Sequence, residues 1–411
     1  MNAMNDLDIN NSQLPDFIVP GVEQKKDEPI KIKVVGVGGG GGNAVNYMYR
    51  QNIQGVSLAL CNTDPQAMSD SPVPIKVAIG DEGAGGEPEE GKRLAEEYEQ
   101  KDGRISALFE DETRMVFITA GMGGGTGTGA GPVVARIAKE KGMLTVGIVT
   151  IPFLFEGEPK ILQAFAGVEE MRKHVDALLV INNERLCKIY PDLSWTNAFS
   201  KADDALANAA RSIAELVSKN GKINLDFADV RTTLKNGGAA VISTGEGEGE
   251  HRMSKAIQNA LISPLLKESD IYDSERVLFN LYFSPEESDE LRIQESKELS
   301  AFMTRFKKRV KVIWGYTHDS SLGKKVKITI LATGFEVSDL TFKGEYGGDA
   351  DEHIAQSQYI VLRPDQLDND ELIDKLEKAP AYDRPKDFRD NFEGGDKRED
   401  SGNGGRRTIK F

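Results

Sequence analysis

The sequence is poor in cysteine and histidine, the residues that form zinc sites, disulfides and thiol redox centres. Its 411 residues include only two cysteines and four histidines, and the histidines are scattered along the chain. Cys61 and Cys187 form neither a CxxC pair nor a metal-ligand spacing. This pattern gives no support to a disulfide framework, a zinc site or a Ser/His/Asp triad, so we interpret both cysteines as reduced, buried thiols.

Long apolar runs and an excess of basic residues are missing as well. No stretch of about 18 apolar residues occurs, and residues 1–28 have neither the basic start nor the apolar centre of a signal peptide. The net charge of −15 and the pI of about 5.0 argue against nucleic acid or an anionic membrane surface as the main partner. We therefore expect a cytoplasmic protein with no nucleic-acid partner and no direct membrane insertion.

Strand-like and helix-like stretches alternate in the first half of the chain. Such an alternation predicts an α/β fold, with a Rossmann-like parallel sheet covered by helices on both faces. The stretches that we expect to form strands are residues 30–37, 56–62, 114–120, 144–151 and 176–182.

The second half has a different organisation. Residues 199–219 carry apolar side chains at steps of three and four, which predicts a long central helix. Strand-like and helical stretches are mixed after it, as in a smaller α+β domain. Beyond Gly344 the chain is too polar to bury a core, and only "QYIVL" and "DELIDKLEKA" could order on contact with a partner. The expected parts are a disordered N-terminal tail (1–28), a nucleotide-binding domain (29–198), the central helix (199–221), the α+β domain (222–344) and an acidic flexible tail with a basic, apolar tip (345–411).

A glycine-rich loop separates the expected strand 114–120 from a helical stretch that we expect to open at Pro132. Residues 121–129 contain six glycines and two threonines. A strand, a glycine loop and a helix in this order form a phosphate-binding geometry, because backbone N–H groups at the helix start face a concavity that glycine leaves open. The segment therefore predicts a phosphate site.

A second glycine loop follows the first expected strand. Gly36, Gly38 and Gly41 have G-x-G-x-x-G spacing, and Asp64 lies near the end of the second strand, as in dinucleotide-binding proteins. A Rossmann-type oxidoreductase using NAD or FAD is thus one hypothesis. Two loops favour a triphosphate instead, and the sequence lacks the G-x-x-x-x-G-K-[ST] motif with its lysine. Backbone N–H groups, helix ends and a cation such as Mg²⁺ would then have to balance the phosphate charge.

Five motifs resemble the FtsZ family of bacterial cell-division GTPases in the tubulin superfamily. In chain order they are "IKVVGVGGGGGNAVN", "CNTDPQAM", "GGGTGTGAGP", "PFLFEG" and "NLDFADVR", and the likeness covers about residues 30–335. The resemblance implies a GTP-binding domain and a protein that hydrolyses GTP and polymerises head to tail at the mid-cell division ring. It also implies that tether and regulator proteins bind the C-terminal tail, although the tip "GGRRTIKF" departs from the usual partner peptide.

The resemblance also implies roles for individual residues. Lys160 stands where the family usually has arginine, and Asp81, Glu82 and Glu87 are acidic where it tends to be neutral, which leaves their effect on phosphate binding open. Glu156 and Asn183 would lie on the ribose side, Phe199 and Asp203 would hold guanine, and Asn224, Asp226 and Asp229 would form the catalytic loop. The remaining nucleotide-binding candidates are Gly38, Gly39, Gly40, Gly41, Gly42, Asn43, Gly125, Thr126, Gly127, Thr128, Gly129 and Lys160.

The chemistry of two positions bears on these roles. The carboxylate of Asp203 would accept hydrogen bonds from N1–H and the amino group of guanine but would face the lone pair of adenine N1; a helix-start carboxylate favoured by the dipole is the alternative. The alternative for Asp226 and Asp229 is that they only cap a helix. They would then have no catalytic role, as in a nucleotide-binding protein that polymerises without hydrolysis. Since they follow the far end of a helix of about 30 Å, we expect them to act on the GTP of a neighbouring subunit.

Overall fold

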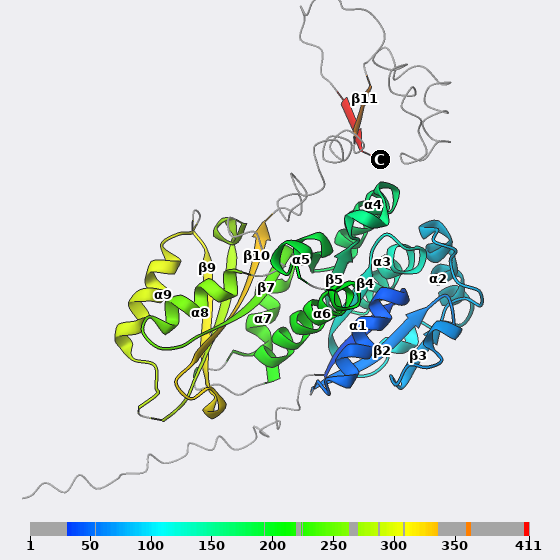
Figure 1. Cartoon of the computed structure of the whole chain (residues 1–411). Helices are drawn as coiled ribbons and strands as arrows, with labels where there is room; N and C mark the ends of the chain where they lie inside the picture. Colours follow the sequence, from blue (N-terminus) through cyan, green and yellow to red (C-terminus); the bar gives the residue numbers. More distant parts are fainter. Residues whose placement is uncertain are drawn as a thin grey trace, which may run out of the picture.

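One ten-stranded sheet runs through the body of the protein (Figure 1). The computed structural model describes residues 31–335 except 54, 193, 219–222, 224, 263–269, 287 and 307–308, and in addition residues 359–362 and 407–410. The strand order is β3-β2-β1-β4-β5-β6-β7-β10-β8-β9.

The first six strands are all parallel, as predicted from the alternation of strands and helices. Strands β2 and β5 have the expected bounds, whereas β3 and α2 were not foreseen from the sequence. The elements are β1 (Lys31–Val37), α1 (Gly38–Arg50), β2 (Val56–Asn62), β3 (Ile75–Ala78), α2 (Pro88–Asp102), β4 (Thr113–Gly121), α3 (Gly125–Glu140), β5 (Leu144–Ile151), α4 (Glu158–His174), β6 (Ala177–Asn182) and α5 (Asn183–Ile189).

The second half continues the same sheet with mixed pairing. Strand β6 pairs parallel with β7 over only two residue pairs, β10 runs antiparallel to both β7 and β8, and β9 pairs parallel to β8 at the edge. The elements are α6 (Trp195–Ser218), α7 (Phe227–Leu234), β7 (Gly238–Gly247), α8 (Arg252–Leu261), β8 (Arg276–Phe283), α9 (Ser296–Met303), β9 (Lys311–His318) and β10 (Val326–Phe335).

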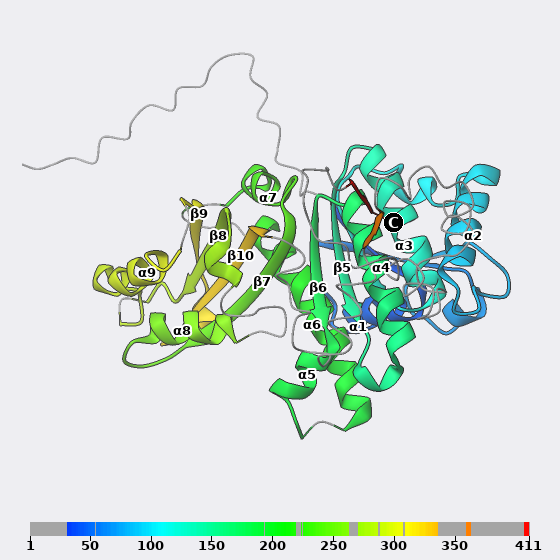
Figure 2. The same cartoon turned by 90° about the horizontal axis from the view of Figure 1, so that it is seen from above.

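The long helix α6 lies between the two halves, with α5 near its start and α7 toward its other end (Figures 1 and 2). Its 24 residues correspond to about 36 Å. It begins four residues before the expected start at Phe199, because Ser194 initiates it: the Ala198 N–H donates to the Ser194 carbonyl (2.9 Å) and the Asn197 N–H to Ser194 Oγ (3.4 Å).

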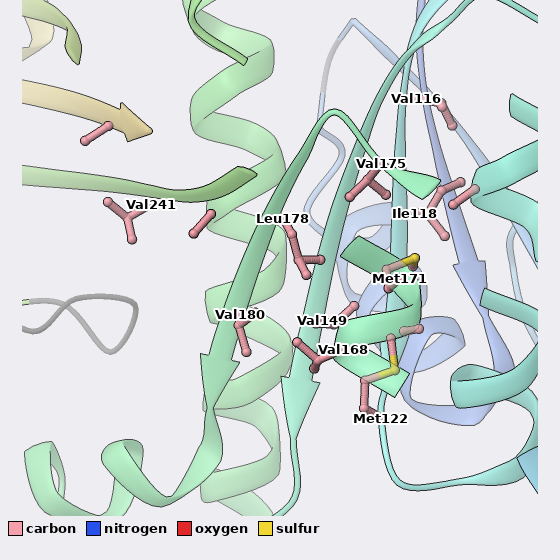
Figure 3. Packing of buried hydrophobic residues seen from close by; sticks show 14 of the residues in the cluster. Val116, Ile118, Met122, Val149, Val168, Met171, Val175, Leu178, Val180 and Val241 are labelled. Carbon is pink, nitrogen blue, oxygen red and sulfur yellow. The ribbon is translucent and has the colours of Figure 1, made fainter. Parts of the chain in front are cut away.

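Each central strand is buried on both faces, so its apolar side chains enter two cores in alternation. On β4, Val116 and Ile118 belong to the core under α3 and α4, and Met115 and Phe117 to the core under α1 and α6. Figure 3 shows the first core, where Met171 of α4 lies over these strands. Burial on both faces explains why these strands read as continuous apolar runs.

The glycine loops contribute to helices, which the sequence did not predict. Helix α1 starts at Gly38, inside the glycine run, and α3 starts at Gly125. The expectation that Pro132 opens α3 is therefore wrong, since Pro132 lies inside the helix. Several of these glycines, among them Gly41 and Gly127, pack on neighbouring backbone where a side chain would not fit.

The described part of the tail is a two-stranded sheet. Strands β11 (Tyr359–Leu362) and β12 (Arg407–Lys410) pair antiparallel, so the "QYIVL" stretch meets the tip of the chain. Among the helices that the structure describes, none has both the length and the apolar character needed to cross a bilayer.

Candidate nucleotide site and catalytic loop

The two glycine segments meet at the carboxyl ends of β1 and β4, which are neighbours in the sheet. Their backbones are in direct contact: a Cβ added at Gly38 would lie 2.9 Å from the Gly127 nitrogen, and one at Gly40 would lie 3.1 Å from Gly121 Cα. Ligands of open α/β sheets bind at this edge of the sheet. The two loops predicted from the sequence thus form one site.

The starts of α1 and α3 lack the side chains that usually satisfy the first N–H groups of a helix. The N-cap residues are Val37 and Gly124, neither start has a side-chain cap, and neither first turn contains an acidic residue. The free N–H groups and the positive end of each helix dipole therefore face the same place. Two adjacent helix starts of this kind form a binding site for a phosphate chain.

The predicted phosphate-binding residues divide into two groups by exposure. Gly39, Gly40 and Asn43 are exposed, and Gly42 and Thr126 are half-buried, so these can face a ligand. The others pack against backbone. This buried group is Gly38, Gly41, Gly125, Gly127, Thr128 and Gly129.

Both threonine hydroxyls of the second loop have partners in the protein. Thr128 Oγ1 is buried and accepts the Gly123 N–H at 2.8 Å, which closes the loop on itself. Thr126 Oγ1 shares a hydrogen bond of 2.6 Å with Thr63 Oγ1 after β2. Thr128 therefore stabilises the loop, and Thr126 joins it to the second strand.

A third segment, residues 83–87 before α2, packs on the first turn of α3. A Cβ at Gly125 would lie 2.9 Å from the Glu87 nitrogen. Asp81, Glu82 and Glu87 are all exposed, and Asp81 Oδ2 accepts the Tyr98 hydroxyl at 3.2 Å. Gln163 links this wall to the second loop, since its Nε2 donates to Gly86 O (2.9 Å) and Gly123 O (3.2 Å). No motif in the sequence singled out Gln163.

Glu156, at the end of a short 3-10 helix, and Lys160, in the first turn of α4, form an ion pair. Lys160 Nζ lies 2.6 Å from Glu156 Oε2, and Glu156 Oε1 accepts the Phe153 N–H at 3.0 Å. Glu156 is half-buried and Lys160 exposed, and the Lys160 carbonyl lies against Gly123. The lysine is thus beside the second glycine loop but is neutralised by a carboxylate.

Asn183 has a buried polar atom without a protein partner. Its side chain is 6% exposed, and no described group donates to its Oδ1. The preceding Asn182 has a structural role, because its Oδ1 accepts the Glu184 N–H at 2.9 Å and caps α5. A buried carbonyl oxygen without a donor is costly, so Asn183 fits a ligand that supplies an N–H or O–H group.

Phe199 and Asp203 lie one turn apart near the start of α6. The Phe199 ring is 45% exposed and meets the Phe153 ring edge-on, with 5.1 Å between centroids. No described residue pairs with the Asp203 carboxylate, and burial raises its pKa to about 6. The adjacent Asp204 differs, since it accepts the Tyr47 hydroxyl at 3.0 Å. Asp203 is therefore the carboxylate that is available to a base.

Asp64, the residue that suggested a dinucleotide site, already has a hydrogen-bond partner in its own turn. Its Oδ1 accepts the Gln66 N–H at 2.8 Å in the turn after β2. Within the described ranges, no group of three or more His, Cys, Asp or Glu side chains could hold a metal ion.

The candidate catalytic loop lies at the start of α7, and its first residue, Asn224, is outside the described residues. Asp226 and Asp229 cap the helix reciprocally: Asp226 Oδ1 accepts the Asp229 N–H (2.9 Å) and Asp229 Oδ2 accepts the Asp226 N–H (3.1 Å). Capping was the alternative interpretation of this pair. The second oxygen of each carboxylate has no described partner.

The loop touches the amino end of β4. The Arg114 guanidinium carbon lies 4.7 Å from the centroid of the Phe227 ring. Gly121, where the second glycine loop begins, lies seven positions after Arg114 on the same strand, a distance of about 23 Å. The glycine loops and the aspartates are therefore at opposite edges of the sheet.

Comparison with known proteins identifies both halves of the chain. Residues 31–191 match the GTPase-domain model of the Tubulin/FtsZ family, and residues 238–336 match the C-terminal-domain model of the FtsZ family. Cell division protein FtsZ of Porphyromonas gingivalis is 52% identical over 396 residues, covering 87% of this chain and 86% of the relative.

More distant relatives agree. Cell division protein FtsZ 1 of Methanocaldococcus jannaschii is 39% identical over 321 residues, covering 77% of this chain and 86% of the relative. A solved structure of an empty FtsZ dimer from M. jannaschii has a TM-score of 0.67 at 37% identity, and the match covers 78% of this chain and 92% of that one.

These matches confirm the resemblance predicted from the five motifs, and they confirm the prediction of a GTPase that binds GTP and GDP. They do not support the oxidoreductase hypothesis. The chain belongs to the Tubulin/FtsZ family, with the GTPase domain of that family followed by the C-terminal domain of FtsZ.

Proposed function

We propose that this GTPase polymerises head to tail into filaments of the bacterial division ring, and that each GTP is hydrolysed with the help of the next subunit. GTP binds at the carboxyl ends of β1 and β4, and Asp226 and Asp229 of the neighbour act on it. The proposal rests on one observation: the glycine loops and the two aspartates lie at opposite ends of strand β4.

Geometry separates the two parts of the site within one subunit. The glycine loop after Gly121 and the Arg114 contact with Phe227 are about 23 Å apart along β4. Side chains as short as Asp226 and Asp229 cannot bridge that distance. A neighbour stacked in the same orientation brings its own α7 start to the glycine loops, and such a contact between two different surfaces repeats into an open filament.

The nucleotide is held mainly by backbone groups. The N–H groups at the starts of α1 and α3 donate to the phosphates, with Gly39, Gly40, Gly42, Asn43 and Thr126 on the exposed side. Asp203 accepts from guanine N1–H and its amino group, and the unpaired Oδ1 of Asn183 accepts from the nucleoside.

Mg²⁺ fits this site as a partner of the phosphate oxygens. The described residues hold no carboxylate cluster that would bind the ion alone, and Mg²⁺ usually keeps waters and binds through phosphates. When bound, it neutralises charge on the phosphates. The chain supplies the donors at the helix starts, and Lys160 supplies a point charge beside them once Glu156 releases it.

The two aspartates act by orienting water. Their reciprocal cap fixes the backbone, while Asp226 Oδ2 and Asp229 Oδ1 are left to accept hydrogen bonds. Asp226 is exposed and Asp229 half-buried, so both can meet a facing subunit. Positioning of this kind suffices for phosphoryl transfer without a covalent intermediate. Asn224, in the same loop, is proposed as a third residue of this set.

The cellular role follows from the relatives. The two relatives described above are cell division proteins, and one similar solved structure is a dimer. We therefore expect the protein in the cytoplasm at the mid-cell division site, with the tether and regulator proteins bound by residues beyond 344.

Concentration dependence tests the proposal. GTP hydrolysis per molecule should rise steeply above a threshold protein concentration and follow sedimentation of polymer. A mixture of Asp229→Ala with a variant unable to bind GTP should recover part of the activity, because one type of junction joins an intact pocket to an intact loop. Constant activity per molecule down to high dilution would show that each subunit works alone.

A further inference from the structure

The described residues Ile223 and Leu225, which precede Asp226 in the chain, lie against the edge strand β9. One edge of β9 pairs with β8, and on its other edge the Tyr316 N–H donates to the Ile223 carbonyl at 3.2 Å. Leu225, two residues later, is 4% exposed. The C-terminal half of the sheet therefore holds the chain immediately before Asp226.

This close approach depends on Gly315. A Cβ added there would lie 2.7 Å from the Ile223 carbonyl oxygen, 2.7 Å from Leu225 Cγ and 3.1 Å from Asn280 Oδ1. Asn280 cannot easily yield, because it is buried and its Nδ2 donates to Thr317 Oγ1 at 3.0 Å. A side chain at position 315 must therefore push Ile223 and Leu225 away from the strand.

A shift of this segment reaches the aspartates directly. Asp226 follows Leu225 in the chain and caps α7 together with Asp229. On the other flank, Phe227 is 7% exposed and lies under the Arg114 guanidinium. Because the loop is held on both flanks, pressure from β9 changes the direction of Asp226 and Asp229 instead of moving the whole loop.

We propose that Gly315 is a positioning residue for GTP hydrolysis: the missing side chain lets β9 set the loop in the orientation that the neighbouring subunit's GTP requires. The inference rests on the proposed function of Asp226 and Asp229. Misplacement of a reacting group by about 1 Å can cost roughly 100-fold in rate. Gly315 is remote from the nucleotide of its own subunit, so GTP binding does not depend on it.

The test uses the full chain and compares Gly315→Ala with wild type. The expected result is a fall in kcat of about tenfold or more, with unchanged GTP affinity and unchanged sedimentation with a non-hydrolysable GTP analogue. Leu225→Ala added to Gly315→Ala should restore part of kcat, because it removes one of the two closest contacts. If Gly315→Ala does not fold, Leu225→Ala alone serves, since loosening the same contact should also lower kcat.

Gly245→Ala on β7 is the matched control. A Cβ there would collide with the backbone of α8, so it strains the same half of the sheet without touching the loop. It should lower the melting temperature and leave kcat per folded molecule unchanged. An equal loss of kcat in Gly245→Ala, or wild-type kcat in Gly315→Ala, would overturn the inference.

Asp229→Asn, measured in parallel, separates this inference from the proposed function. Normal hydrolysis by Asp229→Asn would mean that the proposed role of the aspartates is wrong. Slow hydrolysis by Asp229→Asn together with normal hydrolysis by Gly315→Ala would reject only the role of Gly315.

Discussion

The two ends of strand β4 show how differently helix starts can be used. At the carboxyl end, α1 and α3 begin with no side-chain cap and no acidic residue. At the amino end, α7 begins with two aspartates that cap each other. The first end offers N–H donors and the second offers carboxylate oxygens, so the ends of two stacked subunits are complementary. The difference in capping between these helix starts thus makes the two ends of the molecule chemically distinct, as head-to-tail stacking requires.

Loss of the acidic end should have the largest effect. Asp229→Asn keeps an oxygen that can accept the Asp226 N–H but removes the charge, so α7 should remain capped while water is no longer oriented. We expect hydrolysis to fall about 100-fold or more, measured as phosphate release from assembled protein. GTP binding by the variant should match wild type; a parallel loss of binding would mean that the aspartates belong to the pocket of their own subunit.

The next effect concerns guanine selection at the donor end. Asp203→Asn removes an acceptor for guanine N1–H, and GTP binding should weaken by about 1–3 kcal/mol. Equilibrium titration with GTP and ATP measures both affinity and preference. Asp204→Asn is the matched control, because the carboxylate of Asp204 is bonded to Tyr47 and its loss should leave the preference for GTP intact.

Acid should weaken the same contact reversibly. Burial raises the pKa of Asp203 to about 6, and guanine requires the ionised form. GTP affinity should therefore fall about tenfold between pH 7 and pH 5, and the dependence should be flat in Asp203→Asn. The stability of the nucleotide-free protein has the opposite sign: the contribution of Asp203 is present at low pH and is lost as the pH rises through about 6. A pH-independent affinity in wild type would contradict the role of Asp203.

Alanine substitutions at two nearby glycines, Gly39 and Gly41, should affect GTP binding and folding stability separately. A Cβ at Gly39 meets nothing within 4 Å, whereas one at Gly41 collides with the Thr119 carbonyl. Gly39→Ala should keep its melting temperature and weaken GTP binding, because the methyl group enters the phosphate space. Gly41→Ala should lose about 1–3 kcal/mol of folding free energy. Chemical denaturation and nucleotide titration of both variants measure these changes, and equal stability losses would refute the distinction.

The smallest effect is expected at Arg114. Its exposed guanidinium covers the Phe227 ring, a contact worth about 0.5–1 kcal/mol. Arg114→Ala should lower stability by that amount and reduce hydrolysis slightly through a looser loop, with normal GTP binding. Arg114→Lys keeps a cation, so its stability and its rate of hydrolysis should lie between those of wild type and Arg114→Ala. If Arg114→Ala changes neither stability nor hydrolysis, the Phe227 ring keeps its position without the arginine.

Regular patterns in the sequence were sufficient for the sheet and for the glycine loops. The apolar runs at 56–62 and 144–151 became β2 and β5 with the same bounds. Helix starts are less predictable: because glycine disfavours helices, the sequence predicts loops at Gly38 and Gly125 and a helix start at Pro132. Tertiary packing overruled these propensities, since only glycine fits where two backbones touch.

Contacts between distant segments could not be predicted. Gln163 bridges the second loop and residue 86, and Arg114 contacts Phe227. No sequence motif indicates either of these contacts. The reciprocal cap of Asp226 and Asp229 was foreseeable from their spacing of three, and their separation from the glycine loops was foreseeable from the length of the central helix. That the two parts lie at opposite ends of one strand, β4, needed the structure.

The uncapped starts of α1 and α3 have a consequence for genetics. In the proposed site the phosphate donors are main-chain N–H groups, which every residue except proline possesses. Replacing side chains by alanine removes atoms, so a survey of that kind would pass over the part of the pocket that binds the phosphates. Substitutions that add atoms are the ones that reveal it. The pocket should therefore tolerate substitutions that shorten side chains and be disrupted by substitutions that enlarge them. A site built from side-chain donors has the opposite sensitivity.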